Sequence, residues 1–365
     1  MLLVCPPTTA DFTYWNDGSS ERLMMNERRI SLSNLGLLLV ALGAATWGTD
    51  TALRGKLLTN GAPLGAVQLV LGEHLILAFF AIPVVIRGWQ EIRTLNLGQW
   101  GALMLVGWGG SAVATVIFSQ GIAEAFAMPF AQAVPAFNTV FLLQQTQPIF
   151  AVITAAIFLR ERLTVWYIPI FVVAALGAYL VAPFIVPNNA GSLTPFLQAS
   201  HAPVQFAFYG LGAAALWGSA TSFGRLLSDK LSFTVMTAAR FAMALPLLVV
   251  WALVIDHALI NSFSKGLAQP NGLLYLVLLS LIPGLVGLLV YYRGLRMTRA
   301  SYATLAELAY PATTLLLSTV VLHAPATPLQ IAGLVLVAGA IVAMNLIKGG
   351  VQVAAAPEPT VVATN

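Results

Sequence analysis

Apolar residues run along this chain in long stretches that short polar segments separate. A helix needs roughly 20 apolar residues to cross the hydrocarbon core of a bilayer, so each stretch predicts a membrane-spanning helix. We predict an all-α integral membrane protein with ten transmembrane helices, at residues 32–53, 64–87, 98–120, 138–159, 164–186, 204–226, 232–255, 272–295, 301–322 and 328–347.

The first predicted helix has a counterpart in the sixth. Residues 42–49 read LGAATWGT, and residues 211–219 read LGAAALWGS. An odd number of predicted spans lies between the two copies, so they cross the membrane in opposite directions. We therefore predict two inverted five-helix repeats, at 30–186 and 204–348. Inverted repeats are the usual architecture of a secondary transporter.

The remaining segments lack an apolar run long enough to cross a membrane. We predict a polar N-terminal tail at 1–29, an external linker at 187–203 and a disordered C-terminal tail at 349–365. The first repeat carries ten extra residues within 123–139. They are either a tolerated loop insertion or a lid at the outer mouth.

Composition and charge support this interpretation. The chain is 59% hydrophobic and only 8% charged, with a mean hydropathy of +0.86, whereas a soluble domain carries about 25% charged residues. Thirteen of the 17 Lys and Arg residues fall on one side of the predicted topology and three on the other. The positive-inside rule then predicts a multi-pass protein of the cell inner membrane with both termini cytoplasmic. Basic residues in short loops give no reason to expect nucleic acid as a partner.

Several paired features lie at matching places in the two repeats. They are the dipeptides Trp47-Gly48 and Trp217-Gly218 and the mid-span prolines Pro148 and Pro311. Together with the Glu161-centred run LRERLT at 159–164, they resemble the EamA-type permeases of the drug/metabolite transporter superfamily over residues 30–348. Ala324 takes the place of Glu161 in the second repeat. The resemblance implies a proton-driven or facilitative permease for small metabolites, often amino acids, and does not define the substrate.

Ionisable residues inside a membrane are costly and mark candidate functional sites. Glu73 and His74 lie ~14 Å into the second predicted helix, and Arg240 lies at a similar depth in the seventh. A Glu73–Arg240 ion pair would make a buried latch. Alternatively, Glu73 or His74 takes up protons, since a buried carboxylate and a histidine can both titrate near neutral pH. A solvated groove and a homodimer contact are further alternatives.

Other polar residues are candidates for the transport path. Asp50 either pairs with Arg54 one turn later or meets a substrate amine at an outer gate. Gln144 and Gln147 share one helix face, as do Glu307 and Tyr310. These two faces are either cavity walls or interhelical hydrogen-bonding contacts. Pro148 and Pro311 should kink their helices and free backbone carbonyls.

Trp47 and Trp217 are the aromatic candidates, either as interface anchors or as surfaces that sandwich a substrate. Enzyme signatures are absent from the sequence. No Gly-rich loop ends in Lys-Ser or Lys-Thr, as a phosphate-binding loop would. The four histidines are too scattered for a zinc site, and no Ser-His-Asp arrangement indicates a catalytic triad. We expect no cofactor, no metal and no enzymatic activity.

The expected function is alternating-access transport of a small neutral or zwitterionic metabolite, an amino acid first, outward across the lipid bilayer. Protons are the expected coupling ion if transport is active. The alternatives are a lipophilic-cation exporter using Asp50 or Glu307, a passive channel, and a membrane enzyme or scaffold. The expected substrate contacts are Trp47, Gln144, Gln147, Trp217, Glu307 and Tyr310.

Overall fold

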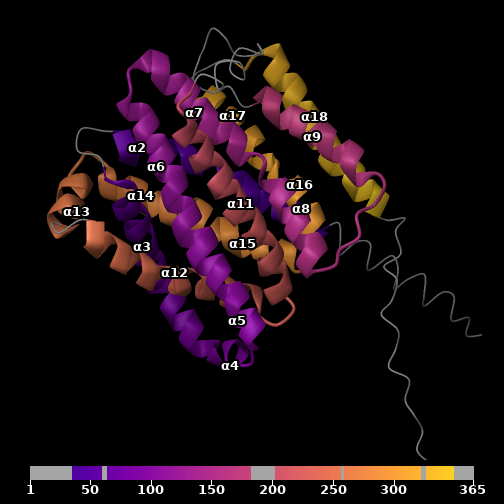
Figure 1. The fold of residues 1–365 in the computed structure, drawn as a ribbon, viewed down its shortest axis with the longest axis horizontal. Helices are drawn as coiled ribbons and strands as arrows, with labels where there is room; N and C mark the ends of the chain where they lie inside the picture. Colours follow the sequence, from indigo (N-terminus) through magenta and orange to yellow (C-terminus); the bar gives the residue numbers. More distant parts are fainter. Residues whose placement is uncertain (1–34, 60–63, 182–201, 256–258, 322–325, 349–365) are drawn as a thin grey trace, which may run out of the picture.

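The computed structural model describes residues 35–59, 64–181, 202–255, 259–321 and 326–348 (Figure 1). Within these ranges every regular element is a helix. The tails predicted at 1–29 and 349–365 lie outside the described residues, as does nearly all of the predicted linker at 187–203.

Six helices in the described part are long and apolar enough to cross a membrane. They are Leu35–Leu58, Ala66–Arg87, Leu97–Ala127, Pro135–Phe158, Phe233–Ile255 and Gly272–Leu295. Large apolar side chains also cover the outside of the bundle, with Phe79 77% exposed and Ile260 86% exposed. A soluble monomer rarely exposes apolar surface on this scale. The prediction of an all-α membrane protein is therefore confirmed.

The first half begins with a helix at 35–46, which a turn at Trp47 separates from α2 (Gly48–Thr59). The elements that follow are α3 (Ala66–Arg87), α4 (Trp89–Ile92), α5 (Leu97–Met104), the π-helical segment η1 (Leu105–Val113), α6 (Ala114–Ala127), α7 (Phe130–Gln144), α8 (Gln147–Phe158) and α9 (Tyr167–Val181).

The second half of the chain shows a similar order. Its elements are α11 (Val204–Leu227), α12 (Phe233–Ile255), α13 (Leu259–Leu267), α14 (Gly272–Leu279), the π-helical segment η2 (Ser280–Val286), α15 (Gly287–Leu295), α16 (Ala300–Glu307), α17 (Ala309–Val321) and α18 (Pro328–Lys348).

Two parts of the first half differ from expectation. The first predicted span ended at residue 53, but α2 continues to Thr59, so Arg54 lies inside a helix and not in a loop. The extra residues within 123–139 are mostly helical, because α6 runs to Ala127 and α7 begins at Phe130 after a short turn. They lengthen two helices and do not form a long loop.

Helices from the two halves of the chain pack directly on one another. Helix α3 lies against α12, α9 lies against α18, and α11 contacts η1, α6, α7 and α8. Figure 1 shows α9 and α18 side by side at one edge of the bundle. They cross at two glycines: a Cβ on Gly177 would lie 2.7 Å from the Gly333 carbonyl oxygen. Small residues of this kind allow membrane helices to approach closely.

Candidate functional site

A cavity inside the bundle is bounded by residues of both halves of the chain. It holds about 1120 Å³ of empty space, part of which is open to solvent. Of the residues predicted from the sequence, all but Pro311 line it, and they are Trp47, Asp50, Glu73, His74, Gln144, Gln147, Pro148, Trp217, Arg240, Glu307 and Tyr310. Residues from distant parts of the chain thus share one site.

Arg54 organises one polar cluster of the cavity. Its Nε and Nη2 donate to the two carboxylate oxygens of Asp50 at 2.7 and 2.6 Å, and Nη2 also lies 3.2 Å from Glu73 Oε2. Nη1 donates to Ser119 Oγ at 3.0 Å. Arg54 is only 2% exposed, so this guanidinium neutralises two carboxylates within the protein. The expected Asp50–Arg54 pair forms, and Glu73 joins it.

Arg240 does not take the partner that the sequence suggested. Its Nε donates to Ser111 Oγ at 2.6 Å and its Nη1 to Tyr292 OH at 2.9 Å. The expected Glu73–Arg240 latch is therefore not formed, because Arg54 from the end of the first span reaches Glu73 instead. Within the described residues, the guanidinium of Arg240 has no ion-pair partner.

His74 follows Glu73 in the chain but makes different contacts. Its Nδ1 lies 2.8 Å from the Val70 carbonyl oxygen, and its ring packs edge-on against Phe241. A carbonyl only accepts hydrogen bonds, so Nδ1 carries the proton in the neutral ring and Nε2 is an acceptor. That buried Nε2 has no hydrogen-bond partner among the described residues.

Glu307 is the centre of a second polar cluster. Tyr291 OH donates to its Oε1 at 2.7 Å, Thr221 Oγ1 to the same oxygen at 3.2 Å, and Gln147 Nε2 to Oε2 at 2.5 Å. Gln144 Nε2 in turn donates to Gln147 Oε1 at 3.0 Å. Among the described residues, every hydrogen-bond donor to this buried carboxylate is neutral.

Helix interruptions place these groups in the cavity. Helix α7 ends at Gln144 and α8 begins at Gln147, with Pro148 in its first turn. Likewise, α16 ends at Glu307 and α17 begins at Ala309, so Pro311 also lies in a first turn. Proline suits a first turn because its missing N–H would have no intrahelical partner there. Each span is thus interrupted by one or two turn residues next to its polar residues.

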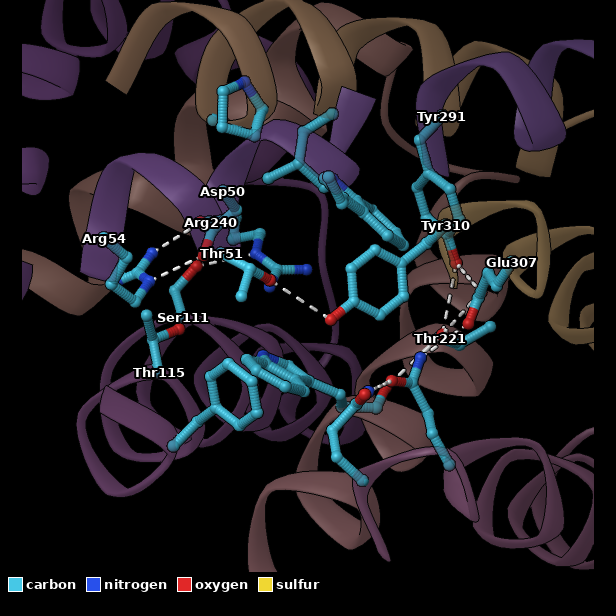
Figure 2. Close-up of a pocket in the computed structure, with 18 of the residues that line it drawn as sticks. Asp50, Thr51, Arg54, Ser111, Thr115, Thr221, Arg240, Tyr291, Glu307 and Tyr310 are labelled. Atoms are coloured by element: carbon cyan, nitrogen blue, oxygen red, sulfur yellow. Dashed lines mark hydrogen bonds and ion pairs between the residues drawn. The ribbon is translucent and has the colours of Figure 1, made fainter. Parts of the chain in front are cut away.

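Aromatic rings separate the two clusters. Trp47 packs against Tyr291 with ring centroids 5.2 Å apart, and Trp217 packs edge-on against Phe118 at 5.3 Å. Figure 2 shows Tyr310 between the group around Arg54 and the group around Glu307, with its hydroxyl directed to Thr51. The site therefore has an aromatic middle and two polar ends.

Trp217 is also held by its indole N–H. It donates to the Gly110 carbonyl oxygen at 2.8 Å, and Gly110 belongs to the π-helical segment η1. A Cβ on Gly110 would lie 2.7 Å from the Cβ of Ala220, so only glycine fits there. Segments of π-helix occur frequently at functional sites, and this one fixes the orientation of a cavity tryptophan.

Sequence reasoning missed several residues of the cavity. Arg54 was expected only as a partner of Asp50, and its contact with Glu73 was not predicted. Thr221 and Tyr291 bind Glu307, and Ser111 binds Arg240. Hydroxyl-bearing residues are common in membrane helices, so nothing in their sequence context distinguished them.

Glu161 lies away from the cavity and has a structural contact. Its carboxylate accepts from the backbone N–H groups of Ala300 and Ser301, at 3.0 and 3.1 Å, and from Ser301 Oγ at 2.7 Å. It thereby caps the N-terminus of α16, where a negative charge is favourable. Glu91 does the same for α12 through Ser232.

A multi-pass helical bundle around a cavity that is both polar and aromatic is typical of membrane transporters. The model of the EamA-like transporter family matches residues 34–182 and 205–346. The chain therefore belongs to the EamA-like transporter family, and the resemblance inferred from the sequence is confirmed. This family points to a transporter and not to an enzyme.

Two known proteins are similar to this chain, one in sequence and one in fold. The riboflavin transporter ImpX of Fusobacterium nucleatum is 28% identical over 311 residues, which cover 82% of this chain and 94% of that protein. A solved structure described only as the crystal structure of a protein aligns with a TM-score of 0.62 at 16% identity, covering 87% of this chain and 97% of the other. The second likeness concerns the fold alone.

Proposed function

We propose that this protein carries a small, neutral, flat heteroaromatic molecule across the membrane by alternating access, with riboflavin as the first candidate. The observation that carries the proposal is the cavity in which aromatic rings lie between two hydrogen-bonding clusters. A flat ring system with polar edges can stack in the middle and form hydrogen bonds at both ends. A riboflavin transporter as a relative of nearly full length supports this class of substrate.

The charges of the cavity also favour a neutral substrate. Its lining contains three carboxylates, Asp50, Glu73 and Glu307, and two guanidinium groups, Arg54 and Arg240. Arg54 is committed to two of the carboxylates, so the site lacks the group of free cations that a polyanion would need. An amino acid, which we expected from the sequence, gains no support from the relatives and becomes the competing candidate.

The proposed architecture has ten spans in two inverted halves, 30–186 and 204–348, with both termini on the cytoplasmic side of the inner membrane. Two separate matches of the family model support the halves. So do three parallels between them: a π-helical segment in the third span of each half, a break before the proline in the fourth, and the paired contacts of α3 with α12 and of α9 with α18. Rocking of one half against the other would expose the cavity to each side in turn.

Trp47, Gln144, Gln147, Trp217, Glu307 and Tyr310 are the proposed substrate contacts. Asp50 is held by Arg54, so we assign it to the buried ion cluster and not to a substrate amine. Proton coupling remains part of the proposal. Glu73, His74 and Glu307 are the candidate proton carriers because all three line the cavity and so become accessible from alternate sides.

Counterflow of labelled riboflavin in proteoliposomes tests the proposal, with and without an imposed pH gradient and beside a panel of labelled amino acids. We expect saturable riboflavin exchange that Trp217→Ala reduces about tenfold or more, because a cavity ring is lost. Trp166→Ala is the matched control, since Trp166 is 57% exposed and does not line the cavity. Exchange of an amino acid but not riboflavin would overturn the substrate, and non-saturating flux would indicate a channel.

A further inference from the structure

Three cavity side chains form a linear hydrogen-bonded chain. It runs from Glu307 in α16 through Gln147 at the start of α8 to Gln144 at the end of α7. All three are at least 91% buried: Glu307 is 6% exposed, Gln147 9% and Gln144 6%. While Glu307 is ionised, it fixes the order of donors and acceptors along this chain, because an ionised carboxylate can only accept.

The fixed order decides which atom of Gln144 is left over. Gln147 must turn its NH₂ group to Glu307, so its Oε1 faces Gln144. Gln144 must then donate its own NH₂ group to that oxygen. Its Oε1 remains, and this buried atom has no hydrogen-bond partner among the described residues. A buried acceptor without a partner is destabilising, so a donor that enters the cavity and reaches this atom gains a favourable contact.

We infer that Gln144 Oε1 is a specificity-determining acceptor that selects substrates bearing an in-plane ring N–H, such as the imide edge of a heteroaromatic ring. The aromatic lining supports a planar donor, because Trp47, Trp217 and Tyr310 line the same cavity as Gln144. The N–H of a flat ring lies in the ring plane, so a ring stacked among these aromatics directs it sideways to the wall. A neutral N–H also adds no charge to a cavity whose lining already contains three carboxylates and two guanidinium groups.

Gln147 is a positioning residue in this arrangement. It hydrogen-bonds to both Glu307 and Gln144. The ionised carboxylate therefore sets the orientation of the Gln147 amide, and Gln147 in turn sets that of the Gln144 amide. Replacing it with leucine would leave Gln144 free to turn its NH₂ group toward the cavity. The preference for a donor would then fall, although Gln144 itself is unchanged.

This inference rests on the proposed transport of a heteroaromatic molecule, and its test separates the two. Isothermal titration calorimetry on the purified full-length protein would compare N–H and N-methyl pairs: riboflavin with 3-methylriboflavin, and 1-methylthymine with 1,3-dimethylthymine. Losing a hydrogen bond while burying an unpaired acceptor should weaken the N-methyl member about 10- to 100-fold. Gln144→Leu should remove this difference by weakening only the N–H member, and Gln147→Leu should reduce it.

Gln145→Leu is the matched control, because Gln145 lines the same cavity but lies outside the chain of hydrogen bonds. It should change both members of a pair alike and keep their ratio. Equal affinity of the wild type for both flavins would overturn the inference while leaving riboflavin transport intact. Binding of neither flavin, with a clear preference for 1-methylthymine over 1,3-dimethylthymine, would refute riboflavin and support the role of Gln144. Binding of no imide at all would overturn the inference.

Discussion

Replacing Arg54 by methionine tests the buried ion cluster most directly. The substitution keeps much of the apolar stem but removes a guanidinium that contacts Asp50, Glu73 and Ser119. Two carboxylates are then left without their cation in the interior of the bundle. Removing one partner of a buried ion pair typically costs about 3–5 kcal/mol.

The structure indicates how that cost divides between the two carboxylates. The side chain of Glu73 is 9% exposed and that of Asp50 22% exposed, so Glu73 has less access to water and should account for the larger share. Adding Glu73→Gln to Arg54→Met replaces the more buried charge with a neutral amide. We expect the double variant to recover about 1–3 kcal/mol of the free energy of unfolding, because a neutral group is less costly to bury than a charge.

The assay is SDS-induced unfolding of the purified protein in mixed micelles, which gives the free energy of unfolding of each variant. Asp229→Asn is the control, since it removes an ion pair with Arg225 in which the Asp229 side chain is 66% exposed. That change should cost no more than about 1 kcal/mol. If Arg54→Met were no more destabilising than Asp229→Asn, water would already screen the cluster and the argument from burial would be refuted.

Three other substitutions test separate parts of the structure. Glu307→Gln should lower transport about tenfold or more with little change in melting temperature, because an amide has a single acceptor oxygen for three donors; unchanged counterflow would contradict this. Gly177→Val should lower the melting temperature by several degrees as α9 and α18 separate, whereas Gly339→Val, where a Cβ meets open space, should not; equal melting temperatures would refute the close crossing. Glu161→Gln should weaken the cap of α16 by about 1 kcal/mol and so speed proteolysis of the turn at 296–299; an unchanged rate of cleavage would contradict this role of the cap.

The sequence alone predicted the features that belong to single segments. Apolar length and low charge identified membrane helices, because a backbone in lipid must satisfy its hydrogen bonds within the helix. Charged and amide residues inside those segments identified members of the cavity, since such groups are costly in a membrane and rarely face lipid. The paired tryptophans and prolines pointed to the family that the comparison then established.

Only the tertiary structure decided which of these residues meet. Glu73 and Arg240 lie at similar depths in their predicted spans, which suggested that they pair. Glu73 instead pairs with Arg54, because the rotation of α3 and the extension of α2 place that guanidinium beside it. Gln147 and Glu307 are 160 residues apart in the chain and hydrogen-bond directly. Hydrophobic length is a property of one segment, whereas a contact between two segments depends on the depth, tilt and rotation of both. Those quantities follow from packing across the whole bundle and leave no local pattern in the sequence.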